Sequence, residues 1–252
     1  QHALTRPGKR VLREIRDYKV GGVILFAANF GTAEDIRQLN EGLQKASLEA
    51  TGVPLLISTD QEGGRVTRVG ADGTIQFPSA MALGQTGVPE YAEDVGFVTG
   101  YELRQLGINL VLAPVLDVNN NPANPVINTR SFGSHSELVG QMGLSLSRGL
   151  RQSLSIPVIK HFPGHGDTDT DSHYALPRIS RNLQELDEIE LAPFREAIED
   201  GAEMVMTAHI LFASLDKENP ATLSPEIIGG LLREKLGFKG LVITDAMEMH
   251  AI

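Results

Sequence analysis

The sequence predicts an α/β fold, a (β/α)8 barrel of the TIM type that is truncated at both ends in this segment. Short aliphatic runs alternate with amphipathic stretches along all 252 residues, which is the pattern of βα units around a parallel sheet. The runs do not alternate between apolar and polar residues, as expected for strands buried on both faces. No Gly-rich phosphate-binding motif follows the first run, which disfavours a doubly wound sheet.

Six aliphatic runs predict the strands: residues 23–26, 55–58, 109–113, 157–160, 204–207 and 241–244. The first visible element is a helix from Lys9 to Tyr18, which leads into the first run. We therefore expect one strand before this helix and one after Asp245, which completes the eight strands of a barrel. The chain opens at Gln1 without an initiator Met or a signal-peptide pattern. We expect residues 1–252 to form one incomplete barrel domain of a longer protein, with room for a further C-terminal domain.

Local capping residues predict where several helices between the strands begin and end. Thr32 and Asn182 each precede an acidic first turn with capping-box spacing, and Ser224 stands before a proline at the first helical position. Gly107 and Gly237 lie where helices are expected to stop.

Composition excludes several classes of function. The 22 Lys and Arg residues oppose 32 Asp and Glu, a formal net charge of −10, so we expect no nucleic-acid partner. No apolar run approaches the roughly 20 residues that span a bilayer, so we expect no membrane segment in this chain. The absence of cysteine excludes disulfides, thiolate zinc sites and cysteine nucleophiles. The compartment (cytoplasm, cell envelope or secreted) and the oligomeric state stay open.

Polar residues gather where the predicted strands end. They are Asn29, Asp60-Gln61-Glu62, Asp117, Lys160-His161, His209 and Asp245. The carboxyl ends of all strands in a parallel barrel open on one face, where barrel enzymes carry their active sites. The pattern therefore predicts a catalytic site on this face.

Potential catalytic or metal-binding side chains are most concentrated in residues 160–173, where three His, three Asp and one Lys occur within fourteen residues. One interpretation is a metal site, since His161 and His165 have i, i+4 spacing. Pro163 and the glycines of residues 164–166 break the helix that this spacing needs. The other interpretation is a mobile loop, hinged at these glycines, that carries a general acid–base. Asp171 and His173 are spaced to pair, so the carboxylate would orient the imidazole.

Asp245 ends a buried run and has two interpretations. It is either the N-cap of a following helix or, beside a histidine acid–base, a carboxylate nucleophile of the kind used in retaining glycoside hydrolysis. The segment from Asp60 to Arg68 offers acidic groups for sugar hydroxyls, and its paired glycines let the backbone approach a ligand.

These motifs together resemble the signatures of glycoside hydrolase family 3, in its β-N-acetylhexosaminidase branch of the NagZ type. The motifs are residues 60–66 (Asp-Gln-Glu-Gly-Gly-Arg-Val), residues 160–166 (Lys-His-Phe-Pro-Gly-His-Gly), residues 171–173 (Asp-Ser-His) and residues 244–245 (Thr-Asp). They occur in the family order along essentially the whole chain. Residues 119–122 (Asn-Asn-Asn-Pro) resemble the members that add a C-terminal α/β domain.

The resemblance implies a retaining β-N-acetylglucosaminidase that removes terminal β-linked GlcNAc from peptidoglycan-derived fragments. It implies that Asp245 is the nucleophile and His173 the acid–base, with Asp171 as its partner. The residues implied to bind the terminal sugar are Asp60, Arg68, Arg130, Lys160 and His161. The resemblance implies neither a cofactor nor a metal.

Four alternatives remain at this point. A β-glucosidase of the same family is disfavoured by the Asp-Ser-His triplet. A β-GlcNAc phosphorylase is possible because a histidine acid–base does not repel phosphate as a carboxylate would. A metal-dependent hydrolase would use His161 and His165, and an inactive sugar-binding module would need no chemistry at all.

Overall fold

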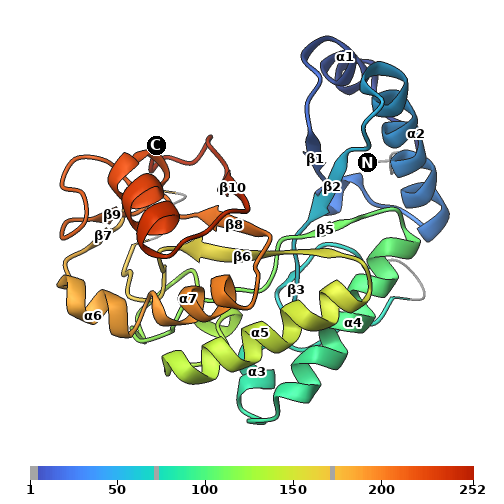
Figure 1. Cartoon of the computed structure of the whole chain (residues 1–252). Coiled ribbons are helices and arrows are strands. Elements are labelled where there is room, and N and C mark those ends of the chain that lie inside the picture. Colours follow the sequence, from blue (N-terminus) through green and yellow to red (C-terminus); the bar gives the residue numbers. More distant parts are fainter. Residues whose placement is uncertain (1–4, 71–73, 171–173) are drawn as a thin grey trace.

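A parallel β-sheet forms the centre of the protein. The computed structural model describes residues 5–70, 74–170 and 174–252. Six strands lie in the order in which they occur along the chain: β1 (Gly22–Ile24), β2 (Leu56–Thr59), β5 (Leu110–Val111), β6 (Ile156–Phe162), β8 (Met204–Thr207) and β10 (Leu241–Thr244). All neighbouring pairs are parallel. Figure 1 shows that the sheet curls into an open half-barrel. The predicted α/β class and parallel sheet are confirmed, whereas a closed barrel is not observed in the described residues.

Each of the six aliphatic runs contains a strand, with shifted ends. The run at 109–113 narrows to Leu110–Val111. Asn109 still pairs through its backbone with Ile57 and Ile156, and its side chain adds hydrogen bonds to the Ile57 amide and the Leu55 carbonyl. The run at 157–160 lengthens to Ile156–Phe162, so Lys160 and His161 lie within β6 instead of directly after it.

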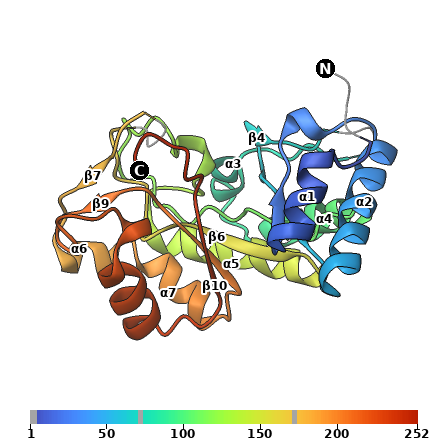
Figure 2. The ribbon, with the colours of Figure 1, turned by 90° about the horizontal axis from the view of Figure 1, so that it is seen from above.

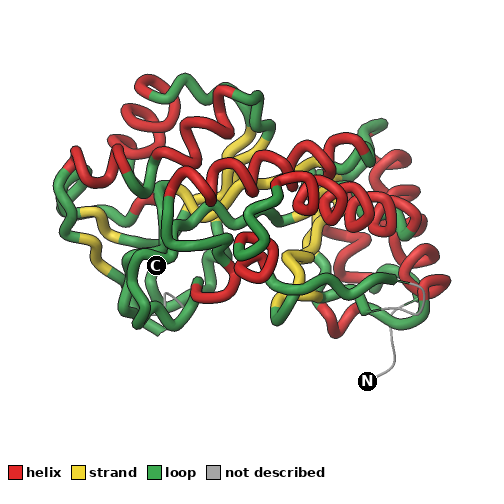
Figure 3. Tube along the Cα trace, turned by 90° about the horizontal axis from the view of Figure 1, so that it is seen from below, coloured by secondary structure: helices red, strands yellow, loops and turns green. Residues whose placement is uncertain are grey.

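Helices cover the outer face of the sheet. They are α1 (Lys9–Tyr18), α2 (Ala33–Thr51), α3 (Ala80–Gly84), α4 (Pro89–Gln105), α5 (Ser136–Gln152), α6 (Leu183–Glu188) and α7 (Ala192–Glu199), with the 3-10 helices η1 (Ala27–Asn29), η2 (Asn128–Arg130) and η3 (Ala221–Leu223) and the π-helix η4 (Glu226–Lys235). Figure 2 shows α1 and α2 at one end of the sheet and α6 and α7 at the other. The view from below shows helices lying across the strands (Figure 3). None of the described helices is long and apolar enough to cross a membrane.

The predicted caps are confirmed. Thr32 and Asn182 form complete capping boxes at α2 and α6. The Ser224 hydroxyl accepts a hydrogen bond from the Ile227 amide at 3.2 Å at the start of η4. Gly107 and Gly237 follow α4 and η4 with φ of 82° and 68°, a left-handed conformation that a side chain would oppose.

The core confirms burial on both faces for the central strands, whereas the edge strands β1 and β10 expose Ile24 and Leu241. On β6, Ile159 packs with Phe162 and Phe194 under the outer helices, whereas its neighbour Val158 packs inside the curl with Leu110. Residues of β6 that face opposite sides of the sheet are therefore both buried. This accounts for the absence of apolar–polar alternation in the sequence.

Two small pairings were not predicted. β3 (Gln61–Gly63) and β4 (Val66–Thr67) form an antiparallel hairpin directly after β2. β7 (Arg178–Ile179) and β9 (Leu211–Phe212) form a parallel pair outside the main sheet. Strands of two or three residues are too short to carry a periodic signal.

Candidate active site

The strands' carboxyl ends open into a pocket of about 1000 Å³. Among the residues lining it are all five side chains predicted to bind sugar and the predicted nucleophile: Asp60, Arg68, Arg130, Lys160, His161 and Asp245. These residues come from β2, β4, η2, β6 and β10 or directly follow one of them. The parallel topology thus brings together residues up to 185 positions apart, since 245 − 60 = 185.

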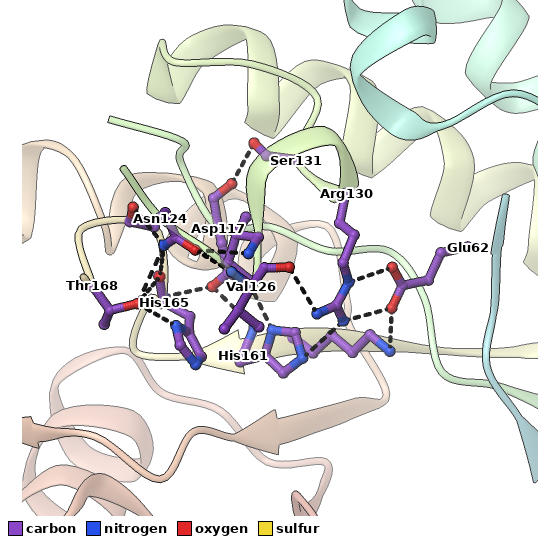
Figure 4. A network of polar contacts seen from close by, with 12 residues as sticks. Glu62, Asp117, Asn124, Val126, Arg130, Ser131, His161, His165 and Thr168 are labelled. Atoms are coloured by element: carbon purple, nitrogen blue, oxygen red, sulfur yellow. Dashed lines mark hydrogen bonds and ion pairs between the residues drawn. The ribbon is translucent and has the colours of Figure 1, made fainter. Parts of the chain in front are cut away.

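A buried ionic cluster forms one wall of the pocket. Lys160 Nζ lies 2.7 Å from Asp60 Oδ1 and 2.7 Å from Glu62 Oε1. Arg130 donates from Nε and Nη2 to the two oxygens of Glu62, both at 2.8 Å, in a bidentate arrangement. Figure 4 shows the Glu62 carboxylate facing the Arg130 guanidinium. Glu62 therefore joins two cations that stand beside the pocket.

The charges of this cluster stabilise one another. Burial alone would raise the pKa of Glu62, but Lys160 and Arg130 lower this pKa to about 2. Burial alone would lower the pKa of Lys160, but Glu62 and Asp60 raise it. Glu62 and Lys160 are consequently both ionised near neutral pH. The cluster presents its cations in fixed positions, as ligand recognition by hydrogen bonding requires.

Glu62 corrects one expectation from the sequence. It was expected to offer a carboxylate to sugar hydroxyls, together with Asp60. Its side chain is only 3% exposed, and both oxygens are engaged by Arg130 and Lys160. Glu62 therefore supports the two cations from behind, whereas Asp60, 18% exposed, faces the pocket.

Arg68 stands on the rim of the same cluster. Its Nε lies 3.9 Å from Asp60 Oδ2. This nitrogen is buried and makes no hydrogen bond to any residue in the described part of the chain. A buried donor without a partner is costly, so a ligand that accepts a hydrogen bond here gains affinity.

A second network orients His161. Asp117 is fully buried, and its Oδ2 lies 2.7 Å from His161 Nδ1. The carboxylate accepts the Nδ1 hydrogen, which turns Nε2 toward the pocket, 3.4 Å from Arg130 Nη2. Burial alone would raise the pKa of Asp117, but His161 and the backbone amide of His165 contribute to lowering it. Asp117 was noted only as a polar strand-end residue, and the structure gives it a specific partner.

The segment after β6 is closely packed at its start. Asn124 Nδ2 donates to the carbonyl oxygens of His165 and Gly166 at 2.8 and 3.0 Å (Figure 4). A Cβ atom at Gly166 would collide with the Val118 carbonyl, and one at Gly164 would press on Glu190. These glycines permit close approach of the backbone, and the expectation that they also serve as hinges stays a prediction.

His165 is not poised to titrate near neutral pH. Its side chain is buried, with Nδ1 2.8 Å from Thr168 Oγ1. Burial and the charge of His161 lower its pKa to about 4. The predicted acid–base pair, Asp171 and His173, lies outside the described residues.

Asp245 ends β10 at the pocket. Its amide donates to the Thr207 carbonyl at 3.2 Å, and its Oδ1 accepts from the Ala246 amide at 2.8 Å. Burial alone would raise the pKa of Asp245, but His161, the Ala246 amide, Lys160 and His209 lower it. The carboxylate is therefore ionised at neutral pH, as a nucleophile must be.

The described residues hold no ready metal site. Within residues 5–70, 74–170 and 174–252, no group of three or more His, Asp or Glu side chains is gathered to hold a metal ion. The Nδ1 atoms of His161 and His165 face Asp117 and Thr168, and the His161 Nε2 faces the Arg130 guanidinium. A nearby cation disfavours metal binding at this nitrogen.

Comparison with known proteins identifies the family. The family profile described as glycosyl hydrolase family 3 N terminal domain matches residues 3–252. The chain belongs to glycosyl hydrolase family 3. Family membership explains why strand-end residues from across the chain converge on one pocket.

The relatives of this family 3 chain include named hexosaminidases. Beta-hexosaminidase A of Pseudoalteromonas piscicida is 40% identical over 254 residues, covering 94% of this chain and 42% of that protein. The structure of a family 3 beta-N-acetylglucosaminidase from Paenibacillus sp. str. FPU-7 matches with a TM-score of 0.97 and 46% identity, covering 100% of this chain and 48% of that one. The chain thus spans less than half the length of these two relatives.

NagZ from Neisseria gonorrhoeae is a third family 3 relative. Its structure in complex with N-trifluoroacetyl-D-glucosamine matches with a TM-score of 0.90 and 35% identity, covering 98% of this chain and 73% of that one. The same enzyme has been solved in complex with a zinc ion.

Proposed function

We propose that this chain forms the catalytic barrel domain of a retaining β-N-acetylglucosaminidase. One observation carries the proposal: the half-buried, ionised carboxylate of Asp245 lines the same pocket as the Asp60, Lys160 and Arg130 cluster. A retaining glycosidase needs a carboxylate nucleophile beside groups that hold the sugar. In the whole protein, we propose that further strands complete the half-barrel into a closed (β/α)8 barrel.

The proposed reaction has two steps. In the first, Asp245 attacks the anomeric carbon, the glycosidic bond breaks, and the leaving oxygen takes a proton from His173. In the second, His173 takes a proton from water, the resulting hydroxide attacks the anomeric carbon, and the ester to Asp245 breaks. Asp171 orients His173. Neither step requires a cofactor or a metal.

The ionic cluster would bind the terminal sugar. Lys160 and Arg130 are donors held by Glu62, and the Asp60 carboxylate is an acceptor that faces the pocket. Arg68 and His161 complete this set, with His161 oriented by Asp117. Several fixed, charged hydrogen-bonding groups around one ring suit a polar sugar better than an apolar ligand.

The proposed substrate is a terminal β-linked GlcNAc of a peptidoglycan-derived fragment. The glucosamine derivative bound by the Neisseria gonorrhoeae enzyme and the names of the two longer relatives support an N-acetylated sugar. A small carbohydrate is accordingly the proposed partner.

Product analysis tests this function. The full-length enzyme is incubated with a β-linked GlcNAc disaccharide and the corresponding glucoside, and the first product is followed by proton NMR. We expect GlcNAc released first as the β-anomer, with little release of glucose. Initial α-anomer would refute retention, and GlcNAc 1-phosphate formed on addition of phosphate would identify a phosphorylase.

A further inference from the structure

A histidine that does not line the pocket makes close contacts behind the candidate nucleophile. His209 follows β8, is 1% exposed and is absent from the pocket wall. Its two ring nitrogens each have a near partner. Nδ1 lies 2.8 Å from Thr222 Oγ1, and Nε2 lies 3.0 Å from the Ala246 carbonyl oxygen.

These two contacts fix the orientation of the ring. A carbonyl oxygen only accepts hydrogen bonds, so Nε2 must carry the hydrogen that points at Ala246. Thr222 is itself buried, and its hydroxyl lies 2.9 Å from the Ala208 carbonyl and 3.0 Å from Thr207 Oγ1. The ring is therefore held by a hydroxyl that is anchored to the end of β8.

Ala246 connects this histidine to Asp245. Its carbonyl oxygen accepts from His209 Nε2, and its amide donates to Asp245 Oδ1 at 2.8 Å. The residue after the carboxylate is thus held at both of its polar groups. Among the described residues, no hydrogen bond reaches Asp245 Oδ2, so the carboxylate has one capped and one uncapped oxygen.

We propose that His209 is a positioning residue for Asp245, which holds Ala246 so that its amide caps Oδ1 and leaves Oδ2 to attack. This inference rests on the proposed role of Asp245 as nucleophile. Reacting atoms must be placed to within a fraction of an ångström, and a shift of 1 Å costs on the order of 100-fold in rate. The bond from His209 acts on the residue next to the carboxylate, where such a shift would arise.

Three variants of the full-length enzyme test this role. His209→Leu removes the hydrogen-bond donor to Ala246 and puts an apolar side chain of similar size in its place. His209→Gln keeps a donor at the end of a chain of similar length. Thr222→Val keeps the shape of Thr222 and removes only the hydroxyl. His135→Leu, at the exposed start of α5, is the control for replacing a histidine away from the pocket.

The readout is the rate of covalent labelling by a 5-fluoro GlcNAc donor, measured together with the KM of an activated aryl GlcNAc substrate and the thermal midpoint of unfolding. We expect His209→Leu to slow labelling on the order of 100-fold with little change in KM. We expect His209→Gln to restore most of the rate and His135→Leu to label like the parent. If His209→Leu does not fold, Thr222→Val replaces it and should slow labelling by a smaller factor.

Two results would overturn the inference. One is labelling at the parent rate in His209→Leu or, where that variant does not fold, in Thr222→Val. The other is equal loss of rate in His209→Leu and His209→Gln at equal thermal midpoints, which indicates a packing role. Peptide mapping of the labelled parent separates this from the proposed function: a label away from Asp245 refutes the nucleophile, whatever the variants do.

Discussion

Replacing Glu62 by Gln removes one charge from the ionic cluster and keeps the shape of the side chain. Both Glu62 oxygens are engaged, one by Lys160 Nζ at 2.7 Å and each by the Arg130 guanidinium at 2.8 Å. The substitution leaves Arg130 buried without its bidentate partner. Lys160 keeps only Asp60 as an anionic partner. Breaking a buried ion pair from one side is strongly destabilising, by about 3–5 kcal/mol.

The pKa of Glu62 gives a second estimate of how much this carboxylate contributes to the free energy of unfolding. Burial opposes ionisation, but Lys160 and Arg130 lower the pKa from 4.5 to about 2 in the folded state. At about 1.36 kcal/mol per unit, the ionised carboxylate contributes about 3 kcal/mol to the free energy of unfolding. A group with a lowered pKa stabilises the fold fully above its unfolded pKa of 4.5. This contribution decreases as the pH falls toward 2, and at pH 3 the same arithmetic leaves about 1 kcal/mol.

Urea denaturation at pH 7 and pH 3 measures this effect. We expect Glu62→Gln to lower the free energy of unfolding by about 3 kcal/mol at pH 7 and by less than half of that at pH 3. Glu34→Gln is the matched control, because Glu34 pairs with Arg37 on the exposed surface of α2 and should cost under about 1 kcal/mol. Equal losses in the two variants at pH 7, or a Glu62→Gln loss that does not change with pH, would show that the buried ion pairs of Glu62 do not stabilise the fold.

Three further predictions concern activity. Asp245→Ala should lower kcat on the order of 10³-fold or more, because no carboxylate remains to form the covalent intermediate. The assay uses an activated aryl GlcNAc substrate, and activity within tenfold of the parent would exclude Asp245 as nucleophile. Full-length enzyme dialysed against EDTA should keep its activity, since the proposed chemistry needs no metal; stoichiometric zinc in elemental analysis, with activity lost on its removal, would contradict this. His173→Ala should lose far more activity on a GlcNAc disaccharide than on the aryl substrate, because a good leaving group needs little protonation. Asp171→Ala should show the same pattern with smaller losses. Equal losses on both substrates in His173→Ala would make His173 a binding residue.

The main strands and several helix ends were predictable because their signals are local. Aliphatic runs predicted all six strands of the sheet, and the capping boxes at Thr32 and Asn182 follow from side-chain chemistry within four residues. The hairpin of β3 and β4 was not predictable in the same way. It is built from polar residues and glycines around Gln61, whose side chain accepts the amides of Arg68 and Val69. That pairing depends on these side-chain hydrogen bonds, which leave no periodic signal in the sequence.

The location of the site was predictable, but the roles of its individual residues were not. Strand-end position placed Asp60, Lys160 and Asp245 on one face, and the structure places them around one pocket. The role of Glu62 depends on Arg130, 68 residues away, and no local pattern shows such a pair. What could have indicated the role of Glu62 is its chemistry. A glutamate beside a buried strand end requires cationic partners, and the residues predicted near the other strand ends supply them. The close packing of the glycines after Phe162 was not predictable, because glycine serves both flexibility and close approach of the backbone, and the sequence does not show which neighbours a glycine meets.

The proposed nucleophile, Asp245, must form a covalent bond to the sugar. The most direct measurement traps this intermediate in the full-length enzyme with a 5-fluoro GlcNAc donor, followed by proteolysis and mass spectrometry of the labelled peptide. Ester-linked sugar on Asp245, absent from the Asp245→Ala variant, is the predicted result. Label on Asp60, Asp117 or any other carboxylate would contradict the claim.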